Sequence, residues 1–179
     1  MKKKVAPIDV LINNAGITIS KRIFEHSFDD WRKVMDVNLD AAWNISQTVA
    51  AKMSQRNNLP NGGASIINIS SIAATKVLKY VPAYVASKAA LSHLTRMMAT
   101  ELAGKNIRVN SIAPGFFLTD LSRDFLESER GVKMLKKIPM KRIGDLHELD
   151  GILILLASDM SSYITGSEII VDGGLSVNT

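Results

Sequence analysis

The sequence alternates compact apolar runs with long segments of helical spacing, and this alternation limits the possible folds more than any other feature. The first run occupies residues 8–12, and three further segments rich in apolar residues, at 64–70, 107–115 and 167–174, follow the same pattern. Short runs that end in turn residues predict strands buried on both faces of a sheet. The segments between them, which we expect to be helical, are residues 27–53, 82–102, about 119–137 and 147–158. Strands that alternate with helices predict βαβ units and a parallel sheet, that is, an α/β fold.

Local signals mark the ends of these elements. Ser27 is a good N-cap for the first long helix, because Asp29 and Asp30 follow it in the first turn. Gly104 is expected to end the helix at 82–102, and Pro-Gly at 114–115 stops the third strand. The sequence shows no internal repeat and no linker, so we expect one domain over residues 1–179.

Composition excludes several classes of protein. The chain has no cysteine, which rules out disulfides and thiolate metal sites, and its three histidines are scattered, so we expect no metal. The net charge is +5, but the basic residues are spread out, apart from the start and residues 133–142. We interpret them as solvated faces rather than a nucleic-acid surface, and a phosphate-bearing cofactor would also suit this charge. No apolar segment is long enough for a membrane span or a secretory signal, so a cytoplasmic protein is expected.

Polar and backbone-exposing residues follow each of the first three predicted strands. Residues 13–16 (Asn-Asn-Ala-Gly) follow the first strand, Ser70 and Ser71 the second, and Pro114, Gly115 and Thr119 the third. The carboxyl ends of parallel strands meet at one edge of the sheet, and ligands bind there. We therefore expect these residues to converge on a binding site.

Tyr84 and Lys88 lie one helical turn apart, near the start of the helix that follows the second strand. An ammonium near a phenol stabilises the phenolate, so we expect Lys88 to lower the pKa of Tyr84 and to make proton transfer feasible. The hydroxyl of Ser71 could hold the reacting oxygen. Such a set suits interconversion of a carbonyl and an alcohol, with a nicotinamide cofactor to carry the hydride. Taken alone, the pair could also be an ordinary contact on a helix surface.

Several motifs in this order resemble those of the classical short-chain dehydrogenase/reductase family. They are Asn-Asn-Ala-Gly at 13–16, Val-Asn-Leu at 37–39, Ile-Asn-Ile-Ser-Ser at 67–71, Tyr-Val-Ala-Ser-Lys at 84–88, residues 108–115 with Thr119 after them, and residues 163–174. Members similar to 3-oxoacyl-carrier-protein reductases and gluconate 5-dehydrogenases come nearest. The resemblance implies a Rossmann-like, doubly wound parallel sheet.

The resemblance also implies roles for individual residues. It implies that Tyr84 is the general acid/base, that Lys88 lowers its pKa and contacts the nicotinamide ribose, and that Ser71 and Tyr84 hold the substrate oxygen. It implies that Asn38 completes the catalytic set through a water in the proton relay. The remaining cofactor contacts it implies, for NAD or NADP, are Asn13, Ala15, Gly16, Pro114, Gly115, Phe117 and Thr119.

The sequence departs from the family in one respect. The family's glycine-rich turn, Thr-Gly-x-x-x-Gly-x-Gly, which binds the cofactor pyrophosphate, does not occur in it. We therefore expect an N-terminally truncated domain without its first strands, with residues 8–12 as an exposed apolar edge. The missing part could be supplied by another chain, the polypeptide or gene could be shortened, or the fragment could rearrange or oligomerise.

Two hypotheses for the function follow. The chain is either an NAD(P)-dependent oxidoreductase that acts on a small carbonyl or alcohol, or a truncated and catalytically inactive fragment that retains oligomerisation surfaces. The resemblance implies a homo-oligomer, a dimer or a tetramer, in which the two long helices and the last strand form the contacts. It implies neither a nucleic-acid partner nor a membrane.

Overall fold

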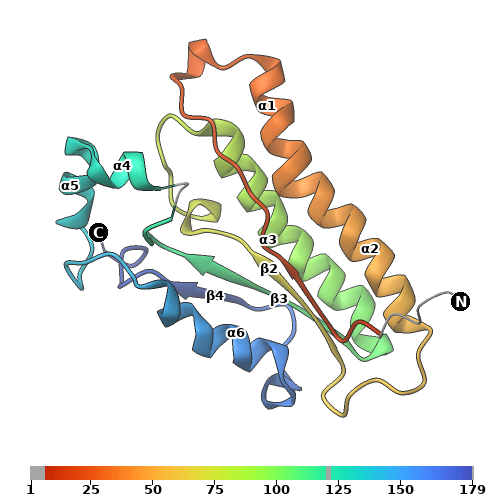
Figure 1. Ribbon diagram of the computed structural model, residues 1–179. Coiled ribbons are helices and arrows are strands. Elements are labelled where there is room, and N and C mark those ends of the chain that lie inside the picture. The colour runs from red at the N-terminus through yellow and green to blue at the C-terminus, as the bar shows by residue number, and fades with distance from the viewer. Residues whose placement is uncertain (1–6, 120–121, 179) are drawn as a thin grey trace, which may run out of the picture.

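The computed structural model describes residues 7–119 and 122–178, and their centre is a four-stranded parallel sheet (Figure 1). The strands are β1 (Val10–Asn13), β2 (Ala64–Ile69), β3 (Ile107–Pro114) and β4 (Glu168–Val171). They lie in the order β1-β2-β3-β4, and each neighbouring pair is parallel. The predicted α/β fold with a parallel sheet is therefore confirmed, and the carboxyl ends of all four strands lie at the same edge.

Helices cover both faces of the sheet (Figure 1). One face carries α2 (Ala41–Ser54) and α3 (Pro82–Leu102), and the other carries α6 (Asp150–Ala157). α1 (Phe28–Met35) leads into α2 through the π-helical segment η2 (Asp36–Asp40). The other helices are α4 (Arg123–Glu127), α5 (Glu129–Leu135) and the short turns η1 (Ile23–Glu25), η3 (Ile72–Ala74), η4 (Ala103–Lys105), η5 (Leu146–Leu149) and η6 (Asp159–Ser161).

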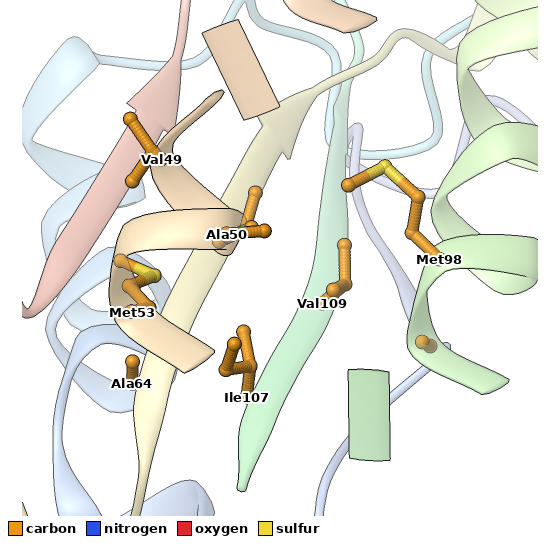
Figure 2. Close-up of a cluster of buried hydrophobic side chains, with 9 residues drawn as sticks. Val49, Ala50, Met53, Ala64, Met98, Ile107 and Val109 are labelled. Carbon is orange, nitrogen blue, oxygen red and sulfur yellow. The ribbon is translucent and has the colours of Figure 1, made fainter. Parts of the chain in front are cut away.

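The alternation of side chains along the strands divides the core into two parts. Ile66 and Val109 pack beneath α2 and α3. Figure 2 shows Val109 together with Met53 and Met98 from those helices. Ile67, the next residue along β2, faces α6 on the other side of the sheet. Successive residues of a strand point to opposite faces, so apolar side chains of β2 and β3 pack against helices on both sides of the sheet.

β1 lies at one edge of the sheet, as expected from the sequence. Ile8 and Ile12 are 44% and 42% exposed, whereas Ile66 and Ile67 in the interior strand β2 are fully buried. On the α6 face, Val10 and Ile169 are also only partly buried. The helical layer on this face is therefore thinner than the layer formed by α2 and α3.

The structure corrects the prediction of a single helix over about 119–137. Two short helices, α4 and α5, occupy this segment and meet at Ser128. The hydroxyl of Ser128 accepts a hydrogen bond from the Gly131 amide and donates one to the Phe125 carbonyl. A serine that bonds to nearby backbone in this way caps a new helix instead of continuing the old one.

The expectation that Gly104 ends the helix at 82–102 was partly wrong. α3 ends at Leu102 as expected, but Gly104 is not its left-handed terminating residue, because Asn106 takes that conformation with φ 55° after the turn η4. Asparagine tolerates this region better than other side chains do. The predicted helix at 27–53 is confirmed: it begins after Ser27, whose side chain accepts from the Asp30 amide, and stays helical to Ser54, with the π-helical segment η2 within it.

Arg108 fastens the amino-terminal end of the sheet to α6. Its side chain is 5% exposed and donates to the carbonyl oxygens of Gly62, Leu156 and Ser158 and to the hydroxyl of Ser161, over 2.6–3.1 Å. The carbonyl groups at a helix C-terminus carry partial negative charge, so a buried cation at this position satisfies them.

We expect the substitution Arg108→Met to lower the free energy of unfolding by about 3 kcal/mol, because it leaves buried carbonyl groups without donors. Urea denaturation measures the loss. Arg96→Met is the matched control, since Arg96 is exposed on α3, and it should change stability by less than about 0.5 kcal/mol. Equal effects of the two substitutions would contradict the structural role of Arg108.

Candidate active site

The candidate site lies where β2 ends and α3 begins. Ser71 follows β2 and caps η3, with its hydroxyl accepting from the Ala73 amide at 3.1 Å. Tyr84 and Lys88 lie in the first two turns of α3, which has Pro82 at its first position. Proline is well suited to this position because its backbone has no N–H to satisfy. The sheet and this helix start together bring Ser71, Tyr84 and Lys88 to one place, as the sequence predicted.

The turn before α3 holds a backbone conformation that is unusual for its residue type. Tyr80 has φ 71°, and its carbonyl accepts a hydrogen bond from the Lys21 amide at 2.9 Å. A non-glycine residue in this region is uncommon and needs support from its surroundings. The bond from Lys21 provides part of that support, and so ties the segment after β1 to the start of α3.

The phenol of Tyr84 forms a side-chain hydrogen bond with Ser71. Burial raises the pKa of Tyr84, and the bond to Ser71 opposes this rise. The sequence had suggested that the Lys88 ammonium would lower the pKa of Tyr84. In the structure burial dominates instead, because removal of water disfavours the phenolate.

Lys88 is a buried amine. Its side chain is 4% exposed, and Nζ lies 5.7 Å from the centroid of the Tyr84 ring. Nζ donates to the carbonyl oxygen of Ile69 at 2.7 Å. Burial lowers the pKa of Lys88 to about 8, so the amine is partly neutral just above physiological pH.

Asn38 lies in the π-helical segment η2 and is 1% exposed. Its Oδ1 accepts from the Ile17 amide at 2.8 Å, and its Nδ2 donates to the Ile17 carbonyl at 3.0 Å. The side chain thus forms a pair of hydrogen bonds with the backbone of Ile17, in the segment after β1. Single π turns inside α-helices occur frequently at functional sites, and here the π turn carries the asparagine that the sequence had nominated.

Gly16 borders the space between Asn38 and Lys88. A Cβ atom at this position would lie 3.5 Å from Lys88 Nζ and 3.6 Å from Asn38 Oδ1. The ammonium and the amide oxygen therefore face a common small space that a larger residue would begin to fill. Ala15, the preceding residue, is exposed.

Asn13 does not border the space beside Gly16 in this way, because hydrogen bonds inside the protein hold its side chain. Its Nδ2 donates to Ser46 Oγ and to Asn68 Oδ1, both at 2.8 Å, and Asn68 in turn donates to Thr95 Oγ1. This network joins β1 and β2 to α2 and α3. The role of Asn13 as a cofactor contact stays a prediction.

The residues nominated after β3 form a second group at the same edge of the sheet. Pro114 ends β3, and the Gly115 amide donates to the Val171 carbonyl at 2.8 Å. Phe117 is 6% exposed and packs beside Gly144. Both the amide and the hydroxyl of Thr119 lie within 3.1 Å of Ser122 Oγ. Phe117 is thus packed inside the protein, and Thr119 is held by hydrogen bonds to Ser122 within the same turn.

Two parts of the site were missed by sequence reasoning. The carbonyl of Ile69 is backbone, so no residue type signals it. Ser87 is fully buried and contacts both Asn38 and Tyr84. A serine directly before Lys88 was visible in the sequence, but its contacts depend on the packing of α3 against η2. The described residues contain no group of three or more histidine or acidic side chains placed to hold a metal ion.

Comparisons with known proteins bear on this geometry. A family model described as enoyl-(acyl carrier protein) reductase matches residues 1–176. A 3-oxoacyl-[acyl-carrier-protein] reductase of Thermotoga maritima is 40% identical over 97% of this chain and 68% of its own length. A 5-keto-D-gluconate 5-reductase of Escherichia coli is 38% identical over 99% of this chain and 68% of its own length. The crystal structure of a gluconate 5-dehydrogenase from Burkholderia cenocepacia, in complex with NADP and tartrate, superposes with a TM-score of 0.93 at 36% identity, covering 98% of this chain and 68% of that one.

This chain belongs to the short-chain dehydrogenase/reductase family. The resemblance drawn from the motifs is confirmed, and so is the Rossmann-like sheet. This member spans about two thirds of the length of the relatives it matches. No helix in the described part of the chain is long and apolar enough to cross a membrane.

The buried amine of this short-chain dehydrogenase/reductase predicts a pH-dependent stability. The ordinary pKa of Lys88 is 10.5, and in the folded chain it is about 8. Between these values the unfolded chain binds more protons at Lys88 than the folded chain, so the free energy of unfolding rises with pH. We expect a rise of about 1–2 kcal/mol between pH 8 and pH 9.5.

Urea denaturation at several pH values measures this rise, and Lys88→Met is the comparison because methionine does not titrate. The rise should be absent from the variant. The raised pKa of Tyr84 acts in the opposite direction, but only above about pH 10, where the unfolded tyrosine loses its proton. Parallel stability curves for the two proteins below pH 10 would contradict the assignment.

Proposed function

We propose that this chain is an NAD(P)-dependent oxidoreductase that interconverts a carbonyl and a secondary alcohol. The observation that carries the proposal is the bond between the hydroxyls of Tyr84 and Ser71, next to the buried ammonium of Lys88. Two hydroxyl groups that converge beside a buried cation can hold and protonate one oxygen atom. The membership of the family supports the same chemistry.

The residues present fit the nicotinamide side of such a cofactor. The space beside Gly16 is bordered by a buried ammonium and an amide oxygen, which is a donor and acceptor set suited to ribose hydroxyls. Among the described residues, the Ile69 carbonyl is the only hydrogen-bond partner of Lys88 Nζ, which has three N–H groups. When bound, NAD or NADP supplies the hydride donor or acceptor. We propose the following residues as its contacts: Asn13, Ala15, Gly16, Tyr84, Lys88, Pro114, Gly115, Phe117 and Thr119.

The raised pKa of Tyr84 has a consequence for the direction of proton transfer. At neutral pH the phenol is protonated, which is the form that donates a proton to a carbonyl oxygen during reduction. Ser71 holds the same oxygen by a second hydrogen bond. Oxidation of an alcohol requires the phenolate, which the ammonium form of Lys88 favours. Asn38 fixes the backbone of Ile17 and borders the space next to Lys88.

The names of the relatives suggest the substrate class. They act on 5-keto-D-gluconate, on gluconate and on 3-oxoacyl carrier-protein substrates, and solved structures contain NADP. We propose a small carbonyl or alcohol of the sugar-acid type as the first substrate to test.

We also propose that the protein is a homo-oligomer with a cytoplasmic location. The exposed apolar residues Trp43 and Met97 on α2 and α3, and Ile170 on β4, support subunit contacts there.

We expect Tyr84→Phe to lower the rate of NADPH-dependent reduction of 5-keto-D-gluconate by about a hundredfold or more, because the proton donor is lost while the ring remains. The decrease in absorbance at 340 nm measures turnover. Binding of NADPH, followed by its fluorescence, should change little, since the phenylalanine ring keeps the packing of α3.

Tyr163→Phe is the matched control, because Tyr163 is fully exposed and removal of its hydroxyl should leave turnover unchanged. Near-normal turnover in Tyr84→Phe would contradict the assignment of the general acid. No turnover of the unmodified protein with NADPH or NADH, on sugar-acid or 3-oxoacyl substrates, would contradict the proposed function.

A further inference from the structure

Ser87 lies between two candidate site residues that come from different elements. It is on α3 and is fully buried. Its Oγ accepts a hydrogen bond from Asn38 Nδ2 at 3.1 Å and donates one to the carbonyl oxygen of Tyr84 at 2.8 Å. The single proton of the hydroxyl and one of its lone pairs are both used. Ser87 is therefore the middle member of a chain of hydrogen bonds that runs from the Asn38 amide to the backbone carbonyl of Tyr84.

Two different contacts hold the amide group of Asn38. The backbone of Ile17 holds one edge, through its N–H to Oδ1 and its carbonyl to Nδ2. Ser87 accepts the second N–H of Nδ2, which points away from that edge. Without Ser87 this N–H would be a buried donor with no partner, and the amide could tilt about the edge held by Ile17. Ser87 is thus the contact that fixes the tilt.

The orientation of the amide matters because Oδ1 faces the space shared with Lys88. A Cβ atom on Gly16 would lie 3.6 Å from Oδ1 and 3.5 Å from Nζ of Lys88, so both atoms border this space. The Asn14 carbonyl oxygen, 4.0 Å from the same Cβ position, borders the space as well, and the Ile69 carbonyl and the Tyr84 ring also face the ammonium. No carboxylate contributes to the environment of Lys88 in the described part of the chain. Oδ1 is therefore one of few negative dipole ends near this buried cation.

We propose that Ser87 is a positioning residue that holds the Asn38 amide with its oxygen toward Lys88. Because Ser87 also donates to the Tyr84 carbonyl in the first turn of α3, it fixes the position of the π-helical segment relative to Tyr84. Its catalytic consequence rests on the proposed function, whereas its effect on Lys88 does not. If Ser87 is lost, the oxygen tilts away and the ammonium form of Lys88 loses a favourable dipole.

Thr95 provides a matched control with the same chemistry at another place on α3. Its Oγ1 accepts from Asn68 Nδ2 at 2.8 Å and donates to the Leu91 carbonyl at 2.9 Å, and the residue is 1% exposed. Ser87 and Thr95 each link a buried asparagine amide to a carbonyl of α3. A role confined to stability would make Ser87→Ala and Thr95→Ala behave alike.

The first experiment follows the titration of Lys88 by NMR of its ¹³Cε group between pH 6 and pH 11, with Lys88→Met to assign the signal. Ser87→Ala should lower the pKa of Lys88 by about half a unit or more. Thr95→Ala should leave it unchanged, and Ser87→Thr, which restores a hydroxyl, should return it toward the original value. A folded Ser87→Ala protein that titrates as the unmodified protein does would overturn the proposal.

If Ser87→Ala does not fold, Ser87→Cys takes its place, because the thiol keeps the volume and weakens both hydrogen bonds. It should shift the Lys88 titration in the same direction by a smaller amount. An unshifted titration in the folded cysteine variant would overturn the proposal as well.

The second experiment compares steady-state kinetics of NADPH-dependent reduction in the same variants. Ser87→Ala should lower kcat about tenfold to a hundredfold, because misplacement of catalytic groups affects the chemical step, while KM stays within about threefold. Equal losses in Ser87→Ala and Thr95→Ala would overturn the positioning role. Absence of turnover in the unmodified protein would refute the proposed function, and the Lys88 titration would still decide the role of Ser87.

Discussion

The hydrogen bond from the buried ammonium of Lys88 to the carbonyl of Ile69 is the contact around which the candidate site is arranged. It joins the second turn of α3 to the last residue of β2. If the helix moved along the sheet, the buried ammonium would lose its hydrogen-bond acceptor, which is costly. The same burial lowers the pKa of Lys88 to about 8 and raises that of Tyr84. One packing arrangement therefore sets both the geometry and the protonation states of the pair.

The rest of the fold holds this contact in place from both sides. The core under α2 and α3 fixes the height of α3 above the sheet (Figure 2). The pair of hydrogen bonds between Asn38 and the backbone of Ile17 brings the segment after β1 to the same place. The parallel sheet makes this convergence possible, because the chain leaves every strand at the same edge. Residues from three separate segments thereby border one small space beside Gly16.

Much of this arrangement could be predicted from the sequence, because strong local patterns specified it. Short segments rich in isoleucine and valine, followed by turn residues, identified β2 and β3, and the spacing of Tyr84 and Lys88 placed them together on one helix face. Other features depend on packing that no local pattern encodes. The break at Ser128 reflects hydrogen bonds between its side chain and nearby backbone, and the left-handed Asn106 reflects the tolerance of asparagine for that conformation. The direction of the Tyr84 pKa shift was also not predictable, since the burial of the phenol that raises its pKa follows from the fold.

We propose that the described residues form the nicotinamide side of a cofactor site that depends on Lys88. A calorimetric titration of this chain with NADPH, and then with NADH, tests it most directly, with Lys88→Met as the comparison. We expect saturable one-to-one binding by the unmodified chain and a clear loss of affinity in the variant, because the ammonium is the buried donor at the site. A folded chain that binds neither cofactor, or a variant that binds as tightly as the original, would contradict it.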